Sequence, residues 1–291
     1  MSDLLTEHAP AKINLTLHVL GRSADGWHEL ESLVVFSRSG DLLSFEPGPA
    51  LSLDVTGPTA MAAGVTGDNL VLKAAHQLAA RVEGLQLGAF RLVKRLPVAA
   101  GIGGGSSDAA AALRLLARAN GLSLDDPRLA EAAKATGSDV PVCLAARGRM
   151  MRGRGEKLGV PLELPPLVAL IVNPRQAVET KPVCAAMNIA PGAASGFGGH
   201  PEIPARAEAA FLLELLRKGR NDMEAAACTI APVIADVLAV LAAAPGCRLA
   251  RMSGSGATCF GLFDSCRSAG RAKKAILAGH PGWWVKCCVL N

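Results

Sequence analysis

Apolar and polar residues alternate near the start of the chain. Between residues 10 and 20 the apolar side chains are Ile13, Leu15, Leu17 and Val19, and the polar ones are Lys12, Asn14, Thr16 and His18. Because successive side chains of a strand point to opposite faces, this pattern predicts a strand with one packed face and one face that looks into water or a cleft. Lys12 and Asn14 share the second face, which is either a solvated edge or part of a site.

The rest of the chain mixes short apolar runs with segments of helical periodicity. Strands are predicted at residues 33–36, 42–45, 51–55, 89–96, 167–173, 248–252, 258–263 and 283–289. Helices are predicted at residues 69–82, 106–120, 126–136, 181–187, 205–218, 222–244 and 266–278. Asp68 is the expected N-cap of the first helix.

This order of elements predicts an α+β fold. Helices of the second half pack on a small antiparallel sheet, which is typical of that class. Prolines cluster at positions 161, 165 and 166, so a boundary is expected there, with one domain at 1–160 and a second at 161–291.

Composition narrows the class of protein. With 291 residues the chain can bury a large core, and 30 basic against 25 acidic residues leave a net charge of only +5. The basic residues form no long block and aromatic residues are few, so no nucleic-acid partner is predicted. Residues 225–244 are almost uncharged, but they are mostly alanine and include Pro232 and Asp236, which favours a buried helix over a membrane span.

The cysteines and histidines bear on compartment and metal binding. The eight cysteines form no C-x-x-C pair and no signal peptide is recognised, so reduced thiols and a cytoplasmic location are expected. The six histidines are scattered without the spacing of zinc ligands. A zinc site is therefore not expected.

A glycine-rich loop between a strand and a helix is the most specific signal. Four of the five residues at 101–105 are glycine, and the helix is expected to open at Ser106 and Ser107. Glycine lets backbone N–H groups approach an anion, and a helix N-terminus adds donors and partial positive charge, so the loop suits phosphate. The expected phosphate-binding residues are Pro97, Val98, Ala99, Ala100, Gly101, Ile102, Gly103, Gly104, Gly105, Ser106 and Ser107.

Other phosphate motifs do not fit this loop. A Walker loop needs Gly-Lys followed by Ser or Thr, and the chain contains no such triplet. A dinucleotide fingerprint needs a third glycine where Ser106 stands. A tight turn with a serine cap is the plain alternative.

Four further residues are candidates on weaker grounds. Trp27 and His28 end a turn-rich loop, where they either contact a planar ligand or close the loop over the core. Asp139 precedes Val-Pro and is either a helix cap or a catalytic carboxylate. Asp108 follows the glycine loop and would oppose an anion there, so its side chain is expected to point away from a nucleotide. The arginines at 147–154 are interpreted as solvated charge.

With these segments in place, the sequence resembles the GHMP kinase superfamily over nearly its whole length. The matching segments, in chain order, are PAKINL (10–15), ADGWH (24–28), DNL (68–70), the glycine loop (96–107), GSDVP (137–141), NDME (221–224) and MSGSGA (252–257). The glycine loop marks the superfamily. The first, second and fifth segments together indicate its branch that acts on a cytidine-diphosphate-linked methylerythritol.

The resemblance implies a fold and a reaction. The fold would combine an N-terminal domain like the second domain of ribosomal protein S5 with a C-terminal ferredoxin-like domain. The reaction would move the γ-phosphoryl of ATP, with Mg²⁺, to the 2-hydroxyl of that substrate in non-mevalonate isoprenoid biosynthesis. Asp139 matches the family's catalytic aspartate and Lys12 its catalytic lysine, and an aspartate can accept the proton of the attacking alcohol.

The resemblance also implies binding residues. Asn69 and Lys94 match adenine-pocket positions, His28 a residue against the cytosine, and Asn14 one near the methylerythritol hydroxyls. Trp27 stands where the family usually has tyrosine, and residues 178–184 lack the second aromatic that often completes the cytosine pocket.

Several questions stay open at this point. The Mg²⁺ ligands are not assigned, no membrane partner is expected, and the protein is a monomer or a weak homodimer. A kinase of the superfamily acting on homoserine or mevalonate, and a nucleotide-binding module without catalysis, are the competing hypotheses.

Overall fold

Packing divides the chain into two units that interleave along the sequence. The structure is a computed structural model, and it describes residues 4–63 and 69–291. Unit 1 comprises Met1–Ala11, Gly40–Val98 and Gly103–Ala146, and unit 2 comprises Lys12–Ser39, Ala99–Ile102 and Arg147–Asn291. The glycine loop therefore passes from unit 1 into unit 2 and back. The domain boundary near residue 160 stays a prediction.

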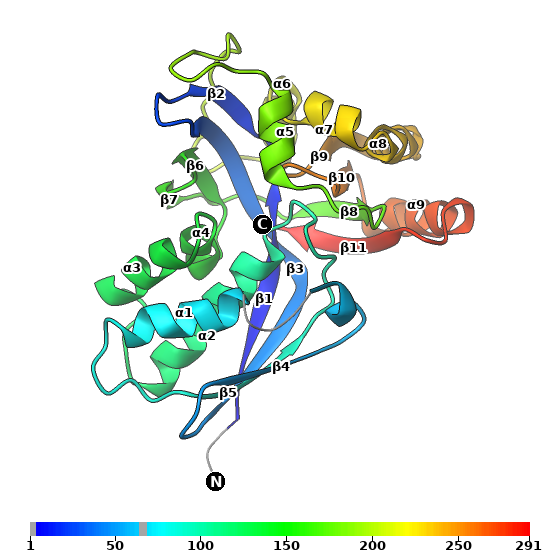
Figure 1. Cartoon of the computed structure of the whole chain (residues 1–291). Coiled ribbons are helices and arrows are strands. Elements are labelled where there is room, and N and C mark those ends of the chain that lie inside the picture. The colour runs from blue at the N-terminus through cyan, green and yellow to red at the C-terminus, as the bar shows by residue number, and fades with distance from the viewer. Residues whose placement is uncertain (1–3, 64–68) are drawn as a thin grey trace. The chain divides into compact units, whose positions relative to one another are not determined.

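Unit 1 contains a mixed sheet with helices beside it (Figure 1). Its strands are the first part of β1 (Leu5–Asn14), the second part of β3 (His28–Pro47), β4 (Ser52–Thr56) and β5 (Gly88–Val93). Strand β4 runs parallel to β5, and β5 runs antiparallel to β3. Its helices are η1 (Ala60–Ala63), α1 (Leu70–Ala79), α2 (Gly104–Ala119), α3 (Pro127–Thr136) and α4 (Val140–Ala145).

Helix α2 is the central helix of unit 1. It packs against α1, α3 and α4, and every residue from 107 to 117 is buried. Alanines at 109–112 and the leucines that follow make almost all sides of the helix apolar, which is typical of a buried helix. The core of unit 1 thus fixes the helix into which the glycine loop leads.

Four strands of unit 2 have the topology of a ferredoxin-like domain. They are β8 (Leu167–Asn173), β9 (Cys247–Met252), β10 (Cys259–Phe263) and β11 (Trp284–Leu290), and they lie in the order β11-β8-β10-β9. All three pairings are antiparallel. Helices separate β8 from β9, and α9 (Cys266–Gly279) separates β10 from β11. This strand-helix-strand-strand-helix-strand order confirms the predicted α+β class and the ferredoxin-like part.

Unit 2 contains three further strands and four further helices among the described residues. Strands β2 (His18–Arg22) and β6 (Arg149–Gly153) pair with the two edges of the first part of β3, and β7 (Lys157–Pro161) pairs with β6. The remaining helices are α5 (Thr180–Ala186), α6 (Ala209–Lys218), α7 (Glu224–Ile230) and α8 (Val233–Ala243). Within residues 4–63 and 69–291, no helix is long and apolar enough to cross a membrane.

Several predicted elements are corrected by the structure. The helix expected at 222–244 is divided into α7 and α8, because Pro232 lacks an N–H group and cannot continue a helix. The strands expected at 33–36 and 42–45 are one continuous strand, β3, and the strand expected at 10–20 is divided into β1 and β2. Helix α1 has Asn69 as its N-cap, and Asp68, the expected cap, lies outside the described residues.

The polar face of the strand predicted at 10–20 is buried, so of the two expected surroundings water is wrong, while a cleft or site stays a prediction. Lys12, Asn14, Thr16 and His18 are each at most 5% exposed. Thr16 Oγ1 lies 2.5 Å from His200 Nε2, and His18 Nε2 accepts a hydrogen bond from the N–H of Arg220. His200 and Arg220, far along the chain in unit 2, thus provide partners for the Thr16 hydroxyl and for His18 Nε2. An alternation pattern does not reveal such partners.

Candidate active site

The tip of the glycine loop, Ala99–Ile102, is held in unit 2 by its carbonyl oxygens. Four consecutive carbonyls each accept one hydrogen bond. The donors, in loop order, are the N–H of Val178 (3.5 Å), the N–H of Thr258 (3.2 Å), Oγ of Ser253 (3.1 Å) and the N–H of Lys12 (2.9 Å). In a trans peptide the N–H points away from the C=O, so this arrangement turns the loop's N–H groups away from these partners.

Positive φ angles alternate along the same loop. The φ angle is +49° at Ala99, +72° at Gly101 and +61° at Gly103. Alternation between left- and right-handed backbone gathers successive N–H groups into a concavity that binds anions. The positive φ angles at alternate residues fit such a pattern, and phosphate binding by the loop stays a prediction.

Unit 1 contributes the start of α2 to this loop. Gly103 is the N-cap and the helix begins at Gly104, two residues before the serine expected from the sequence. The N–H groups of Gly104, Gly105 and Ser106 precede the first hydrogen bonds that a helix can make internally, so they are available donors.

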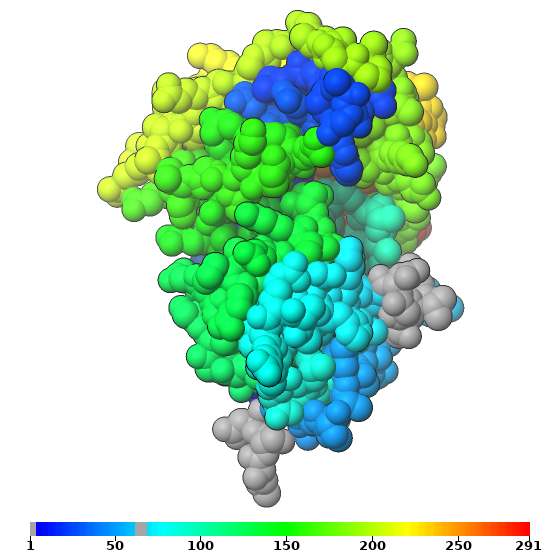
Figure 2. Space-filling model, turned by 60° about the vertical axis from the view of Figure 1, so that its left-hand side comes forward, coloured from blue at the N-terminus to red at the C-terminus, as the bar shows by residue number. Residues whose placement is uncertain are grey.

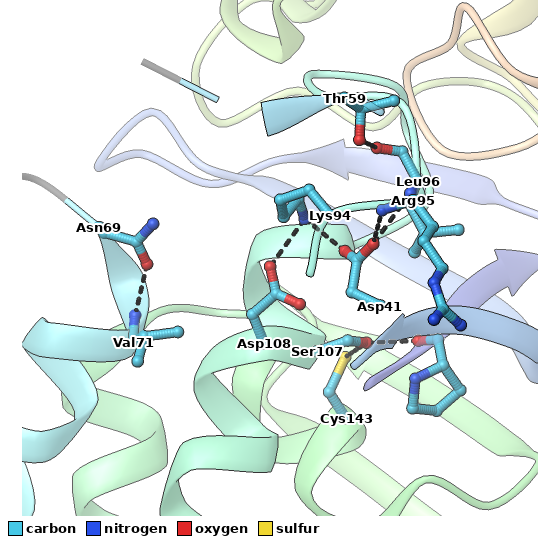
Figure 3. Close-up of polar contacts among 11 residues, drawn as sticks. Asp41, Thr59, Asn69, Val71, Lys94, Arg95, Leu96, Ser107, Asp108 and Cys143 are labelled. Atoms are coloured by element: carbon cyan, nitrogen blue, oxygen red, sulfur yellow. Dashed lines mark hydrogen bonds and ion pairs between the residues drawn. The ribbon is translucent and has the colours of Figure 1, made fainter. Parts of the chain in front are cut away.

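Ser107 anchors the helix start within unit 1. Its N–H donates to the carbonyl of Gly103 at 2.8 Å and its hydroxyl donates to the carbonyl of Pro10 at 2.6 Å. Figure 3 shows the hydroxyl beside Cys143, whose Sγ is 3.3 Å away. The predicted contact of Ser107 with phosphate stays a prediction, since both of its donors bind protein in this structure.

Asp139 lies at the start of α4 in unit 1. It occupies the N-cap position, but its side chain makes no capping hydrogen bond with the helix. The prediction that Asp139 precedes a short helix as its N-cap residue is confirmed, but the cap has no side-chain hydrogen bond. The role of Asp139 as a catalytic base stays a prediction.

Asn14, in unit 2, has an amide whose orientation is set by its neighbours. Its Nδ2 donates to Ser32 Oγ at 2.7 Å, and Ser32 Oγ donates to the carbonyl of Thr16 at 2.6 Å. A hydroxyl has one proton, so Ser32 must accept from Asn14, and the hydrogen-bond network leaves Asn14 Oδ1 as an acceptor. Within the described part of the chain, Oδ1 is buried and has no partner. It therefore suits a donor such as a hydroxyl group.

Trp27 and His28 lie where β2 turns into β3 in unit 2. Trp27 is 56% exposed, and the guanidinium carbon of Arg154 lies 5.2 Å from its ring centroid. Arg154 also pairs with Asp25, so this arginine is a partner of the aromatic ring rather than only solvated charge. Burial, and secondarily Arg22, lower the pKa of His28, which favours the neutral ring.

The segment after α5 runs beside this turn. The N–H of Gly192 donates to the carbonyl of Arg22, and the N–H of Ser195 donates to the carbonyl of Leu20. Figure 2 shows the β2–β3 turn, in blue, beside this yellow-green segment on one surface. The segment thus borders the predicted cytosine-binding residues, although residues 178–184 provide no aromatic side chain.

Asn69 and Lys94, the predicted adenine-pocket residues, contact different partners in unit 1 (Figure 3). Asn69 Oδ1 accepts from the N–H of Val71 at 2.9 Å and so caps α1. Lys94 is buried and its ammonium donates to Asp41 and to Asp108. Their contact with adenine stays a prediction. The side chain of Asp108, expected to point away from a nucleotide, points toward Lys94.

Three supporting residues were not recognised as such from the sequence. Ser253 and Thr258 hold the loop tip, and Ser32 orients Asn14. The glycine-rich segment around Ser253 was a visible signal, because glycines permit close backbone approach. Ser32 carries no such signal, since its partners are one strand away.

The fold and the loop together define the class of this protein. The family "GHMP kinases N terminal domain" matches residues 69–147, and "GHMP kinases C terminal" matches residues 206–281. A crystal structure of a homoserine kinase from Cytophaga hutchinsonii is 19% identical with a TM-score of 0.66, over 100% of this chain and 95% of that one, which supports the fold alone.

Similar sequences identify the branch of that class. A 4-diphosphocytidyl-2-C-methyl-D-erythritol kinase of Methylobacterium radiotolerans is 59% identical over 97% of this chain and 97% of its own. The kinase of the same name from Xanthobacter autotrophicus is 56% identical over 99% of this chain and 100% of its own. A crystal structure of 4-(cytidine 5'-diphospho)-2C-methyl-D-erythritol kinase is 34% identical, with a TM-score of 0.75 over 99% of both chains. The chain belongs to the 4-diphosphocytidyl-2-C-methyl-D-erythritol kinase family.

Proposed function

We propose that this kinase transfers the γ-phosphoryl of ATP to the 2-hydroxyl of 4-diphosphocytidyl-2-C-methyl-D-erythritol. The observation that carries the proposal is the glycine loop, whose carbonyls are all occupied at 99–102 and whose φ angles alternate. Such a loop presents N–H groups to phosphate oxygens without the cost of reorganising them, which is the main way that enzymes stabilise a phosphoryl-transfer transition state.

Asp139 and Lys12 are proposed as the catalytic pair. The Asp139 carboxylate would accept the proton of the attacking hydroxyl, and the Lys12 ammonium would stabilise the negative charge that develops on that oxygen. The place of Asp139 directly before α4, whose first residue Val140 is buried, supports a fixed backbone position for this residue. Lys12 is 5% exposed and its backbone is bonded to the loop tip, which supports a fixed position for its side chain.

Three residues of unit 2 are proposed to bind the acceptor substrate. Asn14 Oδ1 would accept a hydrogen bond from a methylerythritol hydroxyl, as the direction of its amide requires. Trp27 would stack on the cytosine through its exposed ring, and His28 would hydrogen-bond the base edge.

Mg²⁺ is proposed to enter with the nucleotide. Among the described residues, no group of three or more His, Cys, Asp or Glu side chains could hold a metal ion. Mg²⁺ commonly binds substrate phosphates together with one or two carboxylates and water, so it does not need a cluster of three protein ligands. When bound, the ion would neutralise charge on the β- and γ-phosphates, while the residues of the loop orient them.

We propose that the protein acts in the cytoplasm. All eight cysteines are in the reduced form, which accords with action in the cytoplasm, where thiols stay reduced. We propose a monomer or a weak homodimer there.

A phosphoryl-transfer assay with several acceptors tests the proposed function. ADP release and ³¹P NMR of the product would be followed with the cytidine substrate, with the same diphosphate lacking its base, and with homoserine and mevalonate. We expect turnover with the cytidine substrate and little with the other three. Turnover on homoserine or mevalonate, or ATP binding without any turnover, would contradict the proposal and favour a different kinase or a catalytically inactive module.

A further inference from the structure

Three charged side chains form a buried cluster in unit 1 (Figure 3). Asp41 from β3, Lys94 directly after β5 and Asp108 from α2 are 0%, 4% and 2% exposed. The Lys94 ammonium donates to Asp41 Oδ2 and, at 2.7 Å, to Asp108 Oδ2. Burying a charged triad is costly, so its presence calls for a purpose beyond packing.

Asp41 also holds the backbone that enters the glycine loop. Its Oδ1 accepts from the N–H of Arg95 at 2.5 Å and from the N–H of Leu96 at 2.9 Å. On the other side of this segment, Thr59 Oγ1 donates to the carbonyl of Leu96 at 2.8 Å. The residues just before Pro97 are therefore fixed from both sides.

Lys94 connects the segment before the glycine loop to the start of α2, which follows the loop. Asp108 is the fifth residue of α2, so its bond to Lys94 ties the first turns of the helix to the end of β5. A Cβ atom added at Gly104 would lie 3.7 Å from Lys94 Nζ, so the ammonium sits directly beside the first helical residue. One ammonium thus joins both ends of the loop.

We propose that Asp41, Lys94 and Asp108 are positioning residues that hold the two ends of the phosphate loop at a fixed separation and so preorganise the N–H groups of Gly104–Ser106 for ATP. This inference rests on the proposed function of the loop. It gives Lys94 a role without any contact to adenine.

The charge of the cluster makes this role measurable. With all three groups ionised, the cluster has a net negative charge close to donors that receive phosphate. Burial raises the pKa of Asp108 to about 7, with Lys94 opposing the shift and Asp41 adding to it. Asp108 Oδ1 is buried without a partner among the described residues, which accords with a carboxyl that is easily protonated. Phosphate binding should favour the protonated form, so ATP should bind with uptake of protons near pH 7.

The other charged groups near the cluster are already paired or lie beyond it. On β1, His8 approaches Asp41 rather than Asp108, and burial lowers its pKa, so the ring is neutral at pH 7. Lys73 of α1 donates to the carbonyl of Thr136, and Arg114 of α2 pairs with Glu7. Arg95 follows Lys94 and interacts with His8 at a distance. Asp108 is therefore the group expected to titrate.

Two variants of Asp108 separate positioning from general stability. Asp108→Ala removes the tie to Lys94, and we expect a loss of about tenfold or more in affinity for a non-hydrolysable ATP analogue, because a hydrogen bond between charged groups is broken. Asp108→Asn keeps an acceptor for Lys94 and mimics the neutral acid, so its affinity should stay within about twofold of the wild type. Asp54→Asn, an exposed carboxylate on β4, is the control and should change nothing.

Calorimetry with the analogue at pH 7, in buffers of different ionisation enthalpy, gives both affinity and proton uptake. Wild-type protein should take up more protons on binding than Asp108→Asn. Its affinity for the analogue should also fall more between pH 6 and 8 than that of the variant, since deprotonation of Asp108 adds a negative charge near the phosphates. Affinity of Asp108→Ala equal to the wild type, or proton uptake unchanged in Asp108→Asn, would overturn the proposal. Binding of the ATP analogue does not depend on turnover. A wrong assignment of the acceptor substrate would therefore appear only in the phosphoryl-transfer assay of the wild-type protein and not in this calorimetry.

Discussion

Replacement of Gly101 by alanine is the sharpest test of how the phosphate loop is built. A Cβ atom at this position would lie 2.5 Å from the carbonyl oxygen of Ser253 and 2.7 Å from that of Gly256. Both neighbours are backbone atoms, so neither can turn aside as a side chain would. The φ angle of +72° adds strain for any residue other than glycine.

The expected magnitude follows from these contacts. Left-handed backbone costs alanine about 1–2 kcal/mol. The approach of a Cβ atom to 2.5 Å from a backbone oxygen adds to this strain in the docked loop, whereas the bonds from Ser253 Oγ and the N–H of Thr258, each of which contributes about 0.5–1.5 kcal/mol net, oppose its departure. We expect the close approach to outweigh these two bonds and to favour the undocked loop by about 2 kcal/mol, which corresponds to roughly a 30-fold loss of ATP affinity if ATP binds only the docked loop.

Titration calorimetry with a non-hydrolysable ATP analogue measures this loss. Gly121→Ala is the matched control, because Gly121 also has a positive φ, +64°, but a Cβ atom there would meet nothing within 4 Å. We expect the control to lose a little thermal stability and no affinity. Gly101→Ala should melt close to the wild type, since the loop tip can leave without unfolding either core. Analogue affinity within about threefold of the wild type in Gly101→Ala would refute this account of the loop.

Three further substitutions address catalysis and substrate binding. Asp139→Asn should lower kcat by about 10²–10⁴-fold, as expected for loss of a general base, while analogue binding stays unchanged. Ser32→Ala should raise KM for the cytidine substrate by about five- to tenfold with KM for ATP unchanged, because Asn14 loses the partner that orients it. Ser32→Thr keeps the hydroxyl and should return KM for the cytidine substrate to the wild-type value. Arg154→Ala should raise the same KM about two- to fivefold at constant kcat, because a cation–π contact at an exposed site contributes about 0.5–1 kcal/mol.

The outcomes that would contradict these predictions differ from one to the next. Normal turnover in Asp139→Asn would remove this residue from catalysis. An equal rise of both KM values in Ser32→Ala would indicate general loosening rather than orientation of Asn14. A fall in kcat for Arg154→Ala would place this arginine in the chemistry and not beside the aromatic ring.

The glycine loop was predictable because its signals are local. Glycine spacing, the strand before it and the alanine-rich helix after it all lie within one stretch of sequence. The structure differs in ending β5 at Val93 and in beginning α2 at Gly104. Ferredoxin-like topology was implied by resemblance and is confirmed by the strand order. The class of kinase was predictable because seven segments match the GHMP kinase superfamily in the same order along the chain.

Long-range partners were not predictable. Nothing near Asp41 in the sequence indicates that it binds the N–H groups of Arg95 and Leu96, more than fifty positions later. The same reason explains why the polar face of β1 was expected to be open, and why Arg154 was interpreted as surface charge. A charged residue in a pattern shows its chemistry, whereas its partner depends on which distant segment the fold brings to it.

The interleaving of the two units has a consequence for how the enzyme can be divided. The chain crosses between units at five points, after residues 11, 39, 98, 102 and 146. Cutting at position 160 would leave unit 1 intact but remove residues 12–39 from the rest of unit 2, including the strand segment that pairs with β11. Two separately expressed halves would each carry unpaired strand edges, and such edges favour aggregation. Insertions and fusions are better placed at exposed turns such as Gly84, where an added Cβ atom would meet nothing within 4 Å.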